Sequence, residues 1–450
     1  MAQTSIFHVQ LLLLIPSILP DPITLLIGGA CAFVLAYGLT FLVRAFCYKV
    51  GWLDKPAARR VHMIAVPRLG GVAIFAAFVI ASLLFYTPGS NNEIVIYWLL
   101  LAASLLVVIV HAYDDVLGLG PWVKLLAQTL AVVIILGPWD GIFRGVLLFT
   151  VNNPFGSQVM SPGLPWYREP TLTLFISSQV ISFAAIPAIV LTWFWTVGMM
   201  NTVNWIDGMD GLATGVVGIT ALFITIISYM LGQVSIAVLS AIFTGAIFGF
   251  LPHNWNPAKI FMGDSGAMFL GLALAVLSIM GGAKLALALM VLGVPILDVA
   301  VVIINRIRRH QSPVHYDKTH LHHRLMATGL SVRQICYVLY GLSLLFGLLA
   351  VTISGSHSAH LFKFVGVGLV GATMVGLIIW VDYRQRQHGV RIRLGGPEPA
   401  PKGSNTDDRV SESPAVISES DQEHSSQYED KTQESQARQQ TGYPQGIPLP

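Results

Sequence analysis

The sequence predicts an all-α, polytopic membrane protein. Of its 450 residues, 54% are hydrophobic and only 11% are charged, whereas soluble domains contain about 25% charged residues. A helix needs roughly 20 apolar residues to cross the hydrocarbon layer of a bilayer, and many apolar runs approach or exceed that length. Residues 394–450 are instead rich in Ser, Gln, Glu, Asp and Pro, which is typical of disorder. We therefore expect a membrane domain over residues 1–393 and a disordered cytoplasmic tail over 394–450.

About eleven apolar runs are long enough to be considered as transmembrane helices. They fall near residues 22–45, 70–87, 94–113, 121–137, 176–200, 212–231, 234–252, 266–281, 284–304, 333–354 and 361–381. The runs at 121–137 and 266–281 are short for a span. Residues 1–20 are also apolar, and two positions remain open for them: on the membrane surface, or as an extension of the first span.

Lys and Arg in the short loops predict the orientation, because such residues are retained on the cytoplasmic side. They are concentrated in segments 46–69 and 305–333 and just after the last predicted span, while the alternate connections contain few. We therefore expect the N-terminus outside and the C-terminus in the cytoplasm, an arrangement that requires an odd number of spans. Three scattered cysteines without CxxC spacing indicate free thiols rather than a metal or disulfide site.

Polar residues gather at the ends of four predicted spans, all on the side that the topology makes cytoplasmic. The stretches are "HAYDDVLGLG", "NTVNWIDGMDG", "HNWNPAKIFMGDSG" and "HYDKTHLHHRL". Their candidate functional residues are Asp114, Asp115, Asn201, Asn204, Asp207, Asp210, Asp264, His320, His322, His323 and Arg324. Their shared side predicts one cytoplasmic site built from several loops.

A single acid at a loop end is usually a helix cap or a solvated group, and we interpret Asp54, Asp298 and Asp382 in this way. Five carboxylates that converge on one membrane face need cations. A hard divalent ion is the natural partner, Mg²⁺ by preference with Mn²⁺ as an alternative, because it takes oxygen ligands and pairs with phosphates. Residues 263–266 directly precede a predicted helix, whose first amides could hold a phosphate oxygen.

The histidine cluster at residues 320–323 has two interpretations. Zinc is one, but no thiolate lies nearby in sequence, and the neighbouring Lys318 and Arg324 suit an anion better. We therefore favour a phosphate or diphosphate site. The sequence contains no GxxxxGK[ST] pattern, so nothing indicates ATP coupling, and nothing indicates a nucleic-acid partner. The membrane setting suggests a lipid-borne acceptor and a soluble, anionic donor.

These motifs resemble the bacterial polyprenyl-phosphate N-acetylhexosamine-1-phosphate transferases, known as glycosyltransferase family 4. The resemblance covers roughly residues 25–385. It rests on five stretches that occur in family order: "DKPAARRVHMIAVPRLGG", "YDDVLGLGPWVKLLAQ", "NTVNWIDGMDGLATG", "FMGDSGAMFLG" and "DKTHLHHRL". Members are multi-pass enzymes of the bacterial plasma membrane. They transfer a sugar 1-phosphate from a UDP-sugar to undecaprenyl phosphate at the cytoplasmic face and release UMP.

Two branches of the family compete. The branch that uses phospho-N-acetylmuramoyl-pentapeptide typically has three consecutive histidines followed by Phe-Glu. Here the string is His320-Leu321-His322-His323-Arg324, which is similar to the N-acetylglucosaminyl-1-phosphate branch that starts envelope polysaccharides. We favour this second branch. A homodimer is compatible with either.

The resemblance also implies roles for individual residues. Asp264 would be the first Mg²⁺ ligand, and Asp207 and Asp210 would support the metal or orient the uridine. Asp114 and Asp115 would face the acceptor, with one as proton acceptor in a direct displacement; a two-step route through a carboxylate remains open. The expected donor-binding residues are Asn201, Asn204, His320, His322, His323, Arg324, Lys55, Arg59 and Arg68.

A rival class of function is an ion- or proton-coupled transporter. Ionisable residues within a membrane are usually functional, and a transporter places them near mid-span. In this sequence the acids cluster at the predicted cytoplasmic ends of the spans, which favours the enzyme.

Overall fold

The chain is mostly helical, as the sequence predicts. The computed structural model describes residues 21–54, 65–138, 145–147, 151–152, 159–160, 174–176, 179–181, 185–281, 321–354 and 360–387, and five positions between 293 and 302. Residues 1–20, the expected tail at 394–450 and nearly all of the expected span at 284–304 lie outside this part of the chain.

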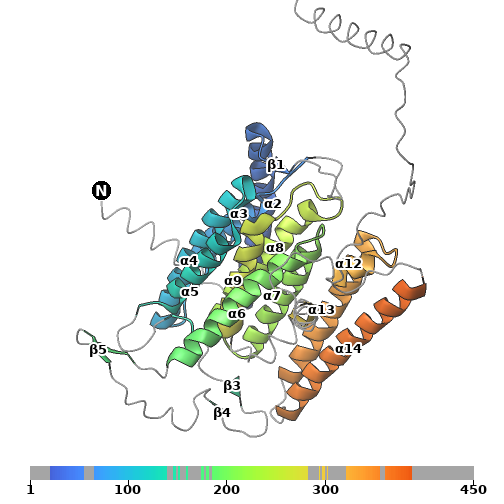
Figure 1. Cartoon of the computed structure of the whole chain (residues 1–450). Coiled ribbons are helices and arrows are strands. Elements are labelled where there is room, and N and C mark those ends of the chain that lie inside the picture. The colour runs from blue at the N-terminus through green and yellow to red at the C-terminus, as the bar shows by residue number, and fades with distance from the viewer. Residues whose placement is uncertain are drawn as a thin grey trace, which may run out of the picture. The chain divides into compact units, whose positions relative to one another are not determined.

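Helices run through the described residues from end to end (Figure 1). They are α2 (Asp21–Val50), α3 (Gly70–Phe85), α4 (Asn91–Leu117), α5 (Pro121–Leu136), α6 (Ala185–Ile206), α7 (Leu212–Met230), α8 (Val234–Asn254), α9 (Gly263–Met280), α12 (Leu321–Met326), α13 (Val332–Ser354) and α14 (His360–Gln387). Three short antiparallel pairs accompany them: β1 (Leu53–Asp54) with β2 (Val66–Pro67), β3 (Val151–Asn152) with β4 (Val159–Met160), and β5 (Leu174–Ile176) with β6 (Gln179–Ile181).

Six of the described helices are long and apolar enough to cross a membrane: α2, α4, α7, α8, α9 and α13. Shorter apolar helices lie at 70–85, 121–136 and 368–381. The protein is therefore a polytopic helical membrane protein.

The expected span at 176–200 is wrong at its start. Residues 174–176 and 179–181 form the β5–β6 pair, with Leu174 opposite Ile181, and helix α6 begins only at Ala185 and continues to Ile206. A short apolar run rich in β-branched residues is compatible with a strand or a helix, so periodicity could not place this boundary. As a result, Asn201 and Asn204 lie within the last turns of a helix.

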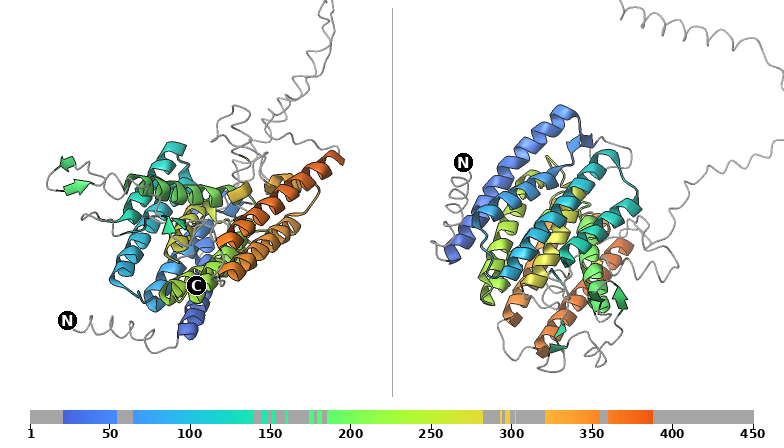
Figure 2. Two further views of the ribbon diagram at one scale, coloured as in Figure 1. Left: turned by 90° about the horizontal axis from the view of Figure 1, so that it is seen from below. Right: turned by 90° about the vertical axis from the view of Figure 1, so that its left-hand side faces the viewer.

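Helix α9 is the central helix of the bundle. It packs against α3, α4 and α6, and both views in Figure 2 show it inside the group of helices. Its residues are buried from Ser265 to Ser278, whereas α2 buries only 22% of its most apolar window. A helix that is apolar on every side belongs in the core, and the sequence of α9 meets that condition.

Glycines allow α9 to meet the start of α3 at backbone contact. A Cβ atom on Gly71 would lie 2.1 Å from the amide nitrogen of Gly266. The same segments are joined by three backbone hydrogen bonds: Gly70 N to Phe261 O (3.0 Å), Gly71 N to Met262 O (2.8 Å) and Phe261 N to Pro67 O (2.8 Å). The residues before α3 are thereby fixed beside those before α9.

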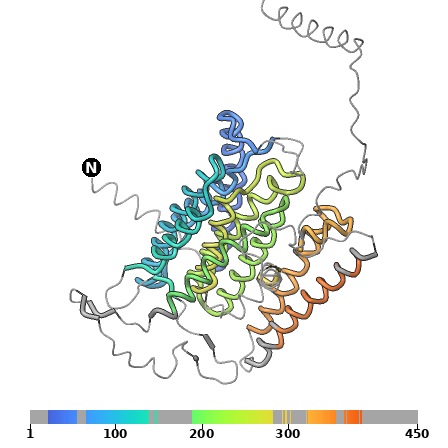
Figure 3. The backbone as a smooth tube through the Cα atoms, viewed as in Figure 1, coloured from blue at the N-terminus to red at the C-terminus, as the bar shows by residue number. Residues whose placement is uncertain are grey.

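The polar motifs consequently share one end of the bundle. The C-terminal ends of α4, α6 and α8 and the N-terminal ends of α5, α7 and α9 meet there, and Figure 3 traces the backbone that joins them. Because consecutive helices alternate in direction, motifs that are far apart in sequence reach this end together.

We expect Gly71→Ala to destabilise the protein by about 1–3 kcal/mol, because the new methyl group would overlap backbone that cannot move aside. The measurement is thermal unfolding in detergent. Gly38→Ala is the matched control, since nothing lies within 4 Å of a Cβ at that helical position. Equal unfolding temperatures for the two variants would contradict the proposed close crossing.

Candidate active site

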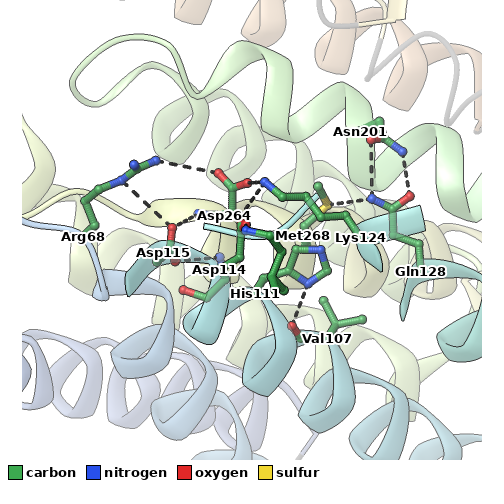
Figure 4. Close-up of polar contacts among 12 residues, drawn as sticks. Arg68, Val107, His111, Asp114, Asp115, Lys124, Gln128, Asn201, Asp264 and Met268 are labelled. Carbon is green, nitrogen blue, oxygen red and sulfur yellow. Dashed lines mark hydrogen bonds and ion pairs between the residues drawn. The ribbon is translucent and has the colours of Figure 1, made fainter. Parts of the chain in front are cut away.

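Asp115 caps the N-terminus of α9. Its Oδ1 accepts a hydrogen bond from the Asp264 amide at 2.8 Å, and its Oδ2 accepts one from the Ser265 amide at 3.0 Å (Figure 4). The first amides of a helix have no partner within it, and a carboxylate there also interacts favourably with the helix dipole. Two of the amides that the sequence assigned to a phosphate oxygen are therefore already used by Asp115, and that expectation is wrong for them.

Gly263 makes this cap sterically feasible. Its φ of +75° suits glycine, and a Cβ there would lie 2.0 Å from the Arg68 carbonyl oxygen and 2.5 Å from Asp115 Oδ2. The glycine that precedes Asp264 in "FMGDSG" thus has a steric reason: it lets the 68–71 backbone and the Asp115 carboxylate approach the start of α9 together.

Three carboxylates and two cations form one cluster at this helix end, which we call the charge cluster: Asp114, Asp115, Asp264, Arg68 and Lys124. Lys124 Nζ lies 2.5 Å from Asp114 Oδ2 and 2.7 Å from Asp264 Oδ2. Arg68 Nη2 lies 3.8 Å from Asp264 Oδ1, and its Nε lies 4.0 Å from Asp115 Oδ1. The helices α4, α5 and α9 and the segment before α3 each contribute to it (Figure 4).

The two neighbouring aspartates have different environments. Asp115 binds backbone amides with both oxygens, whereas Asp114 binds the Leu119 amide through Oδ1 at 2.6 Å and the Lys124 ammonium through Oδ2. Asp114 therefore also closes the tight turn from α4 to α5. Lys124 is the close partner of Asp114 Oδ2, whereas Arg68 lies 4.0 Å from an Asp115 oxygen that already accepts an amide, so Asp114 is the aspartate of the pair that can more readily exchange its partner.

Asp210 joins two loops at the same end of the bundle. It is 7% exposed, and its Oδ2 accepts hydrogen bonds from Asn256 Nδ2 at 2.9 Å and from the Ala258 amide at 3.0 Å. Cys336 and Tyr340 of α13 donate to the carbonyl oxygens of Asp210 and Gly211. The turn between α6 and α7 is thereby fixed to the segment that leads into α9.

Asp207 lies in that turn and is half-buried. Desolvation by the surrounding protein raises the pKa of Asp207 well above its usual value, and the negative charge of Asp264 adds to this effect. The positive charge of Arg68 acts in the opposite direction on the Asp207 pKa.

Asn201 belongs to a second polar layer beneath the charge cluster. Its Nδ2 donates to Gln128 Oε1 at 2.9 Å and to the Val197 carbonyl at 2.8 Å, and Gln128 donates back at 3.4 Å. This amide pair joins α5 to α6. Asn204 is half-buried near the end of α6, and its carbonyl accepts the Asp207 amide at 3.2 Å.

The histidine motif is described only in part. Lys55, Arg59 and His320 lie outside the described residues, as does the side chain of His322. His323 is half-buried on α12. Arg324 is 2% exposed and donates to the Ile378 carbonyl of α14 at 3.4 Å. The roles assigned to these residues in donor binding stay predictions. Asp298, interpreted as a cap, accepts the Leu321 amide at the start of α12 at 2.7 Å.

Lys124 is the site residue that the sequence interpretation did not single out. It lies within the run 121–137, which was treated as a span because its neighbours are apolar. A lone lysine in such a run is itself a signal, because an ionisable group in an apolar helix usually has a partner and a function. Its partners are on α4 and α9, so only the tertiary structure identifies them.

The donor set fits a divalent cation that is completed by substrate oxygens. Both Asp264 oxygens interact with cationic side chains, Lys124 and Arg68, which can yield to a metal ion. No group of three or more His, Cys, Asp or Glu side chains within the described residues forms a ready metal cage. Mg²⁺ is commonly held by one or two carboxylates together with substrate phosphates, and this arrangement matches that pattern.

The fold and the site together define a membrane enzyme whose charged residues meet at one end of a helical bundle. Comparison with known proteins gives the family. Residues 97–282 match the model of glycosyl transferase family 4, and these residues include both Asp114 and Asp264. The chain belongs to this family.

Similar proteins come from two branches. The chain is 33% identical over 330 residues to a probable undecaprenyl-phosphate N-acetylglucosaminyl 1-phosphate transferase of Bacillus subtilis (71% of this chain, 82% of the relative). It is 32% identical to a decaprenyl-phosphate N-acetylglucosaminephosphotransferase of Mycolicibacterium smegmatis (78% and 87%). A phospho-N-acetylmuramoyl-pentapeptide-transferase of Staphylococcus aureus is 36% identical over a shorter stretch of 177 residues (39% and 54%).

Asp115→Ala should lower the free energy of unfolding by about 0.5–2 kcal/mol, as expected for loss of a helix cap, and should also lower activity because Asp264 is no longer held in place. Ser90→Ala is the control, since the Ser90 hydroxyl caps α4 at its other end by accepting the Glu93 amide. Thermal unfolding and transferase activity are measured for both. If the two variants lose stability equally and both keep activity, the positioning role of Asp115 is refuted.

Proposed function

We propose that the protein transfers N-acetylglucosamine 1-phosphate from a UDP-sugar to undecaprenyl phosphate and releases UMP, as the first membrane step of a cell-envelope polysaccharide. The observation that carries this proposal is the contact of Lys124 with Asp264 at the start of α9. It supports the proposal because a lysine that could bind phosphate and a carboxylate that could hold a metal ion lie within one hydrogen bond of each other. The long matches to N-acetylglucosaminyl 1-phosphate transferases support the sugar.

In the proposed topology of eleven spans, the site would face the cytoplasm of a bacterial cell. Loop segments 46–69 and 305–333 are rich in Lys and Arg, and the first of them leads into α3 at the charge cluster. Because such loops stay on the cytoplasmic side, the proposed topology gives the site access to soluble nucleotide sugars. The lipid acceptor would arrive within the membrane.

Lys124 and Arg68 would neutralise negative charge on the donor diphosphate. When bound, Mg²⁺ would neutralise the charge that develops on the leaving UMP. Asp264 would hold this ion, with Asp207 beside it, and Asp210 would support it from the turn that it fixes to Asn256. Asn204 and the histidine motif would contribute to donor binding.

The chemistry proposed is a direct displacement. An oxygen of the lipid phosphate attacks the phosphorus that bears the sugar, and the bond from that phosphorus to the UMP oxygen breaks. Asp114 accepts a proton from the lipid phosphate if that group arrives protonated. We assign this role to Asp114 because Asp115 has both oxygens bound to backbone amides.

The positions of the acids also favour the enzyme over a transporter, since the acids in the six candidate spans lie near helix ends.

Asp264→Asn should lower the rate of UMP release by at least about 100-fold, because an amide would hold the metal ion more weakly and the loss of one electrostatic stabiliser of a transition state typically costs that much, while the protein remains folded. Glu93→Gln is the matched control: it makes the same carboxylate-to-amide change at the opposite end of α4. Purified protein is assayed with undecaprenyl phosphate, UDP-N-acetylglucosamine and Mg²⁺. Near-normal turnover by Asp264→Asn would remove this residue from the metal-binding role.

The choice between branches predicts turnover with UDP-N-acetylglucosamine or a related UDP-N-acetylhexosamine. Purified protein is given a panel of these donors together with UDP-N-acetylmuramoyl-pentapeptide, each with and without Mg²⁺ or Mn²⁺. Activity only with the pentapeptide donor would reverse the assignment. The same preparation tests whether the protein is a homodimer, because light scattering in detergent measures the mass of the particle.

A further inference from the structure

His111 is a completely buried imidazole one helical turn before Asp114 on α4. Its Nδ1 lies 2.8 Å from the Val107 carbonyl oxygen. Because a carbonyl can only accept, this contact places the proton of a neutral ring on Nδ1 and leaves a lone pair on Nε2. Among the described residues, no group forms a hydrogen bond with Nε2. A buried acceptor without a donor is unfavourable, so this atom needs an explanation.

Lys124 is the donor best placed to supply one. Figure 4 draws His111 in the same close-up as Lys124, Asp114 and Asp264, and these three residues are the charged groups that act electrostatically on the His111 ring. An ammonium has three N–H donors, and in this structure Asp114 and Asp264 account for two of them. The neighbouring amide of Gln128 already donates to Asn201 and Met268.

We propose that His111 is a positioning residue for Lys124. Its Nε2 accepts a hydrogen bond from the Lys124 ammonium when Asp264 binds a divalent cation in place of Lys124. This inference rests on the proposed function, which identifies the substrate bound to that cation as the donor diphosphate. A metal ion on Asp264 competes with Lys124 for Oδ2. A further acceptor for the ammonium would let Lys124 give up that oxygen while its charge stays next to Asp114 and the bound diphosphate.

The proposal predicts that losing the acceptor weakens metal binding only while Lys124 is present. His111→Leu removes the ring nitrogen, and His111→Gln keeps a side-chain acceptor of comparable reach. Lys124→Ala removes the competitor for Asp264. Mn²⁺ binding to purified full-length protein in detergent, without substrates, is followed by the electron paramagnetic resonance signal of the free ion. Thermal unfolding of each variant establishes that it is folded.

We expect His111→Leu to weaken Mn²⁺ binding about fivefold and His111→Gln to remain within about twofold of wild type, a coupling in the range found for groups in contact. In the Lys124→Ala background, His111→Leu should change binding by less than about twofold. Equal losses in both backgrounds would mean that His111 only packs the core, and would overturn the proposal. So would wild-type affinity in His111→Leu, failure of His111→Gln to restore binding, or a wild-type protein that binds no Mn²⁺.

A parallel assay separates this inference from the proposed function. UMP release is titrated with Mg²⁺, and the concentration for half-maximal activity should rise in His111→Leu and not in His111→Gln. A wild-type protein that shows the Mn²⁺ coupling but transfers no sugar phosphate would refute the proposed function alone. An active wild-type protein without the coupling would refute the role of His111 alone.

Discussion

The site depends on how the N-terminus of α9 is held. The Asp115 carboxylate binds the amides of Asp264 and Ser265, and the 67–71 backbone pairs with residues 261–262 from the other side. Gly263 and Gly71 are the positions at which a side chain would break this arrangement. Because the Asp264 carboxylate is attached to the first turn of α9, its place relative to α3, α4 and α5 follows from these backbone contacts.

Charge neutralisation is the second constraint. Carboxylates removed from water are costly unless they are paired and hydrogen-bonded. In the charge cluster, backbone amides donate hydrogen bonds to Asp115, whereas Lys124 pairs with both Asp114 and Asp264. Arg68 forms longer ion pairs with Asp115 and Asp264. Side-chain cations can be exchanged for a metal ion and phosphate in a way that backbone amides cannot. The cluster therefore balances its carboxylates with side chains whose contacts could be replaced by those of a charged ligand.

Much of this organisation could be predicted from the sequence, but with clear limits. Clusters at the ends of apolar runs indicated that Asp114, Asp115 and Asp264 would meet, and the structure brings them together at one end of the bundle. The start of α6 was misplaced, since residues 174–176 and 179–181 pair as strands. Lys124 was overlooked because its neighbours in the sequence are apolar and its partners are about 140 residues away or on another helix.

The sequence by itself determined the environment and the side of the bundle. Apolar length requires membrane helices, and the positions of the polar motifs at the ends of those helices put their chemistry at the membrane boundary. Only the tertiary structure decided which partners each of two similar residues binds. Asp114 and Asp115 are adjacent and chemically identical, yet one faces a lysine and the other faces two amides. That difference arises from the direction of each side chain toward α5 or α9, which depends on how the helices pack.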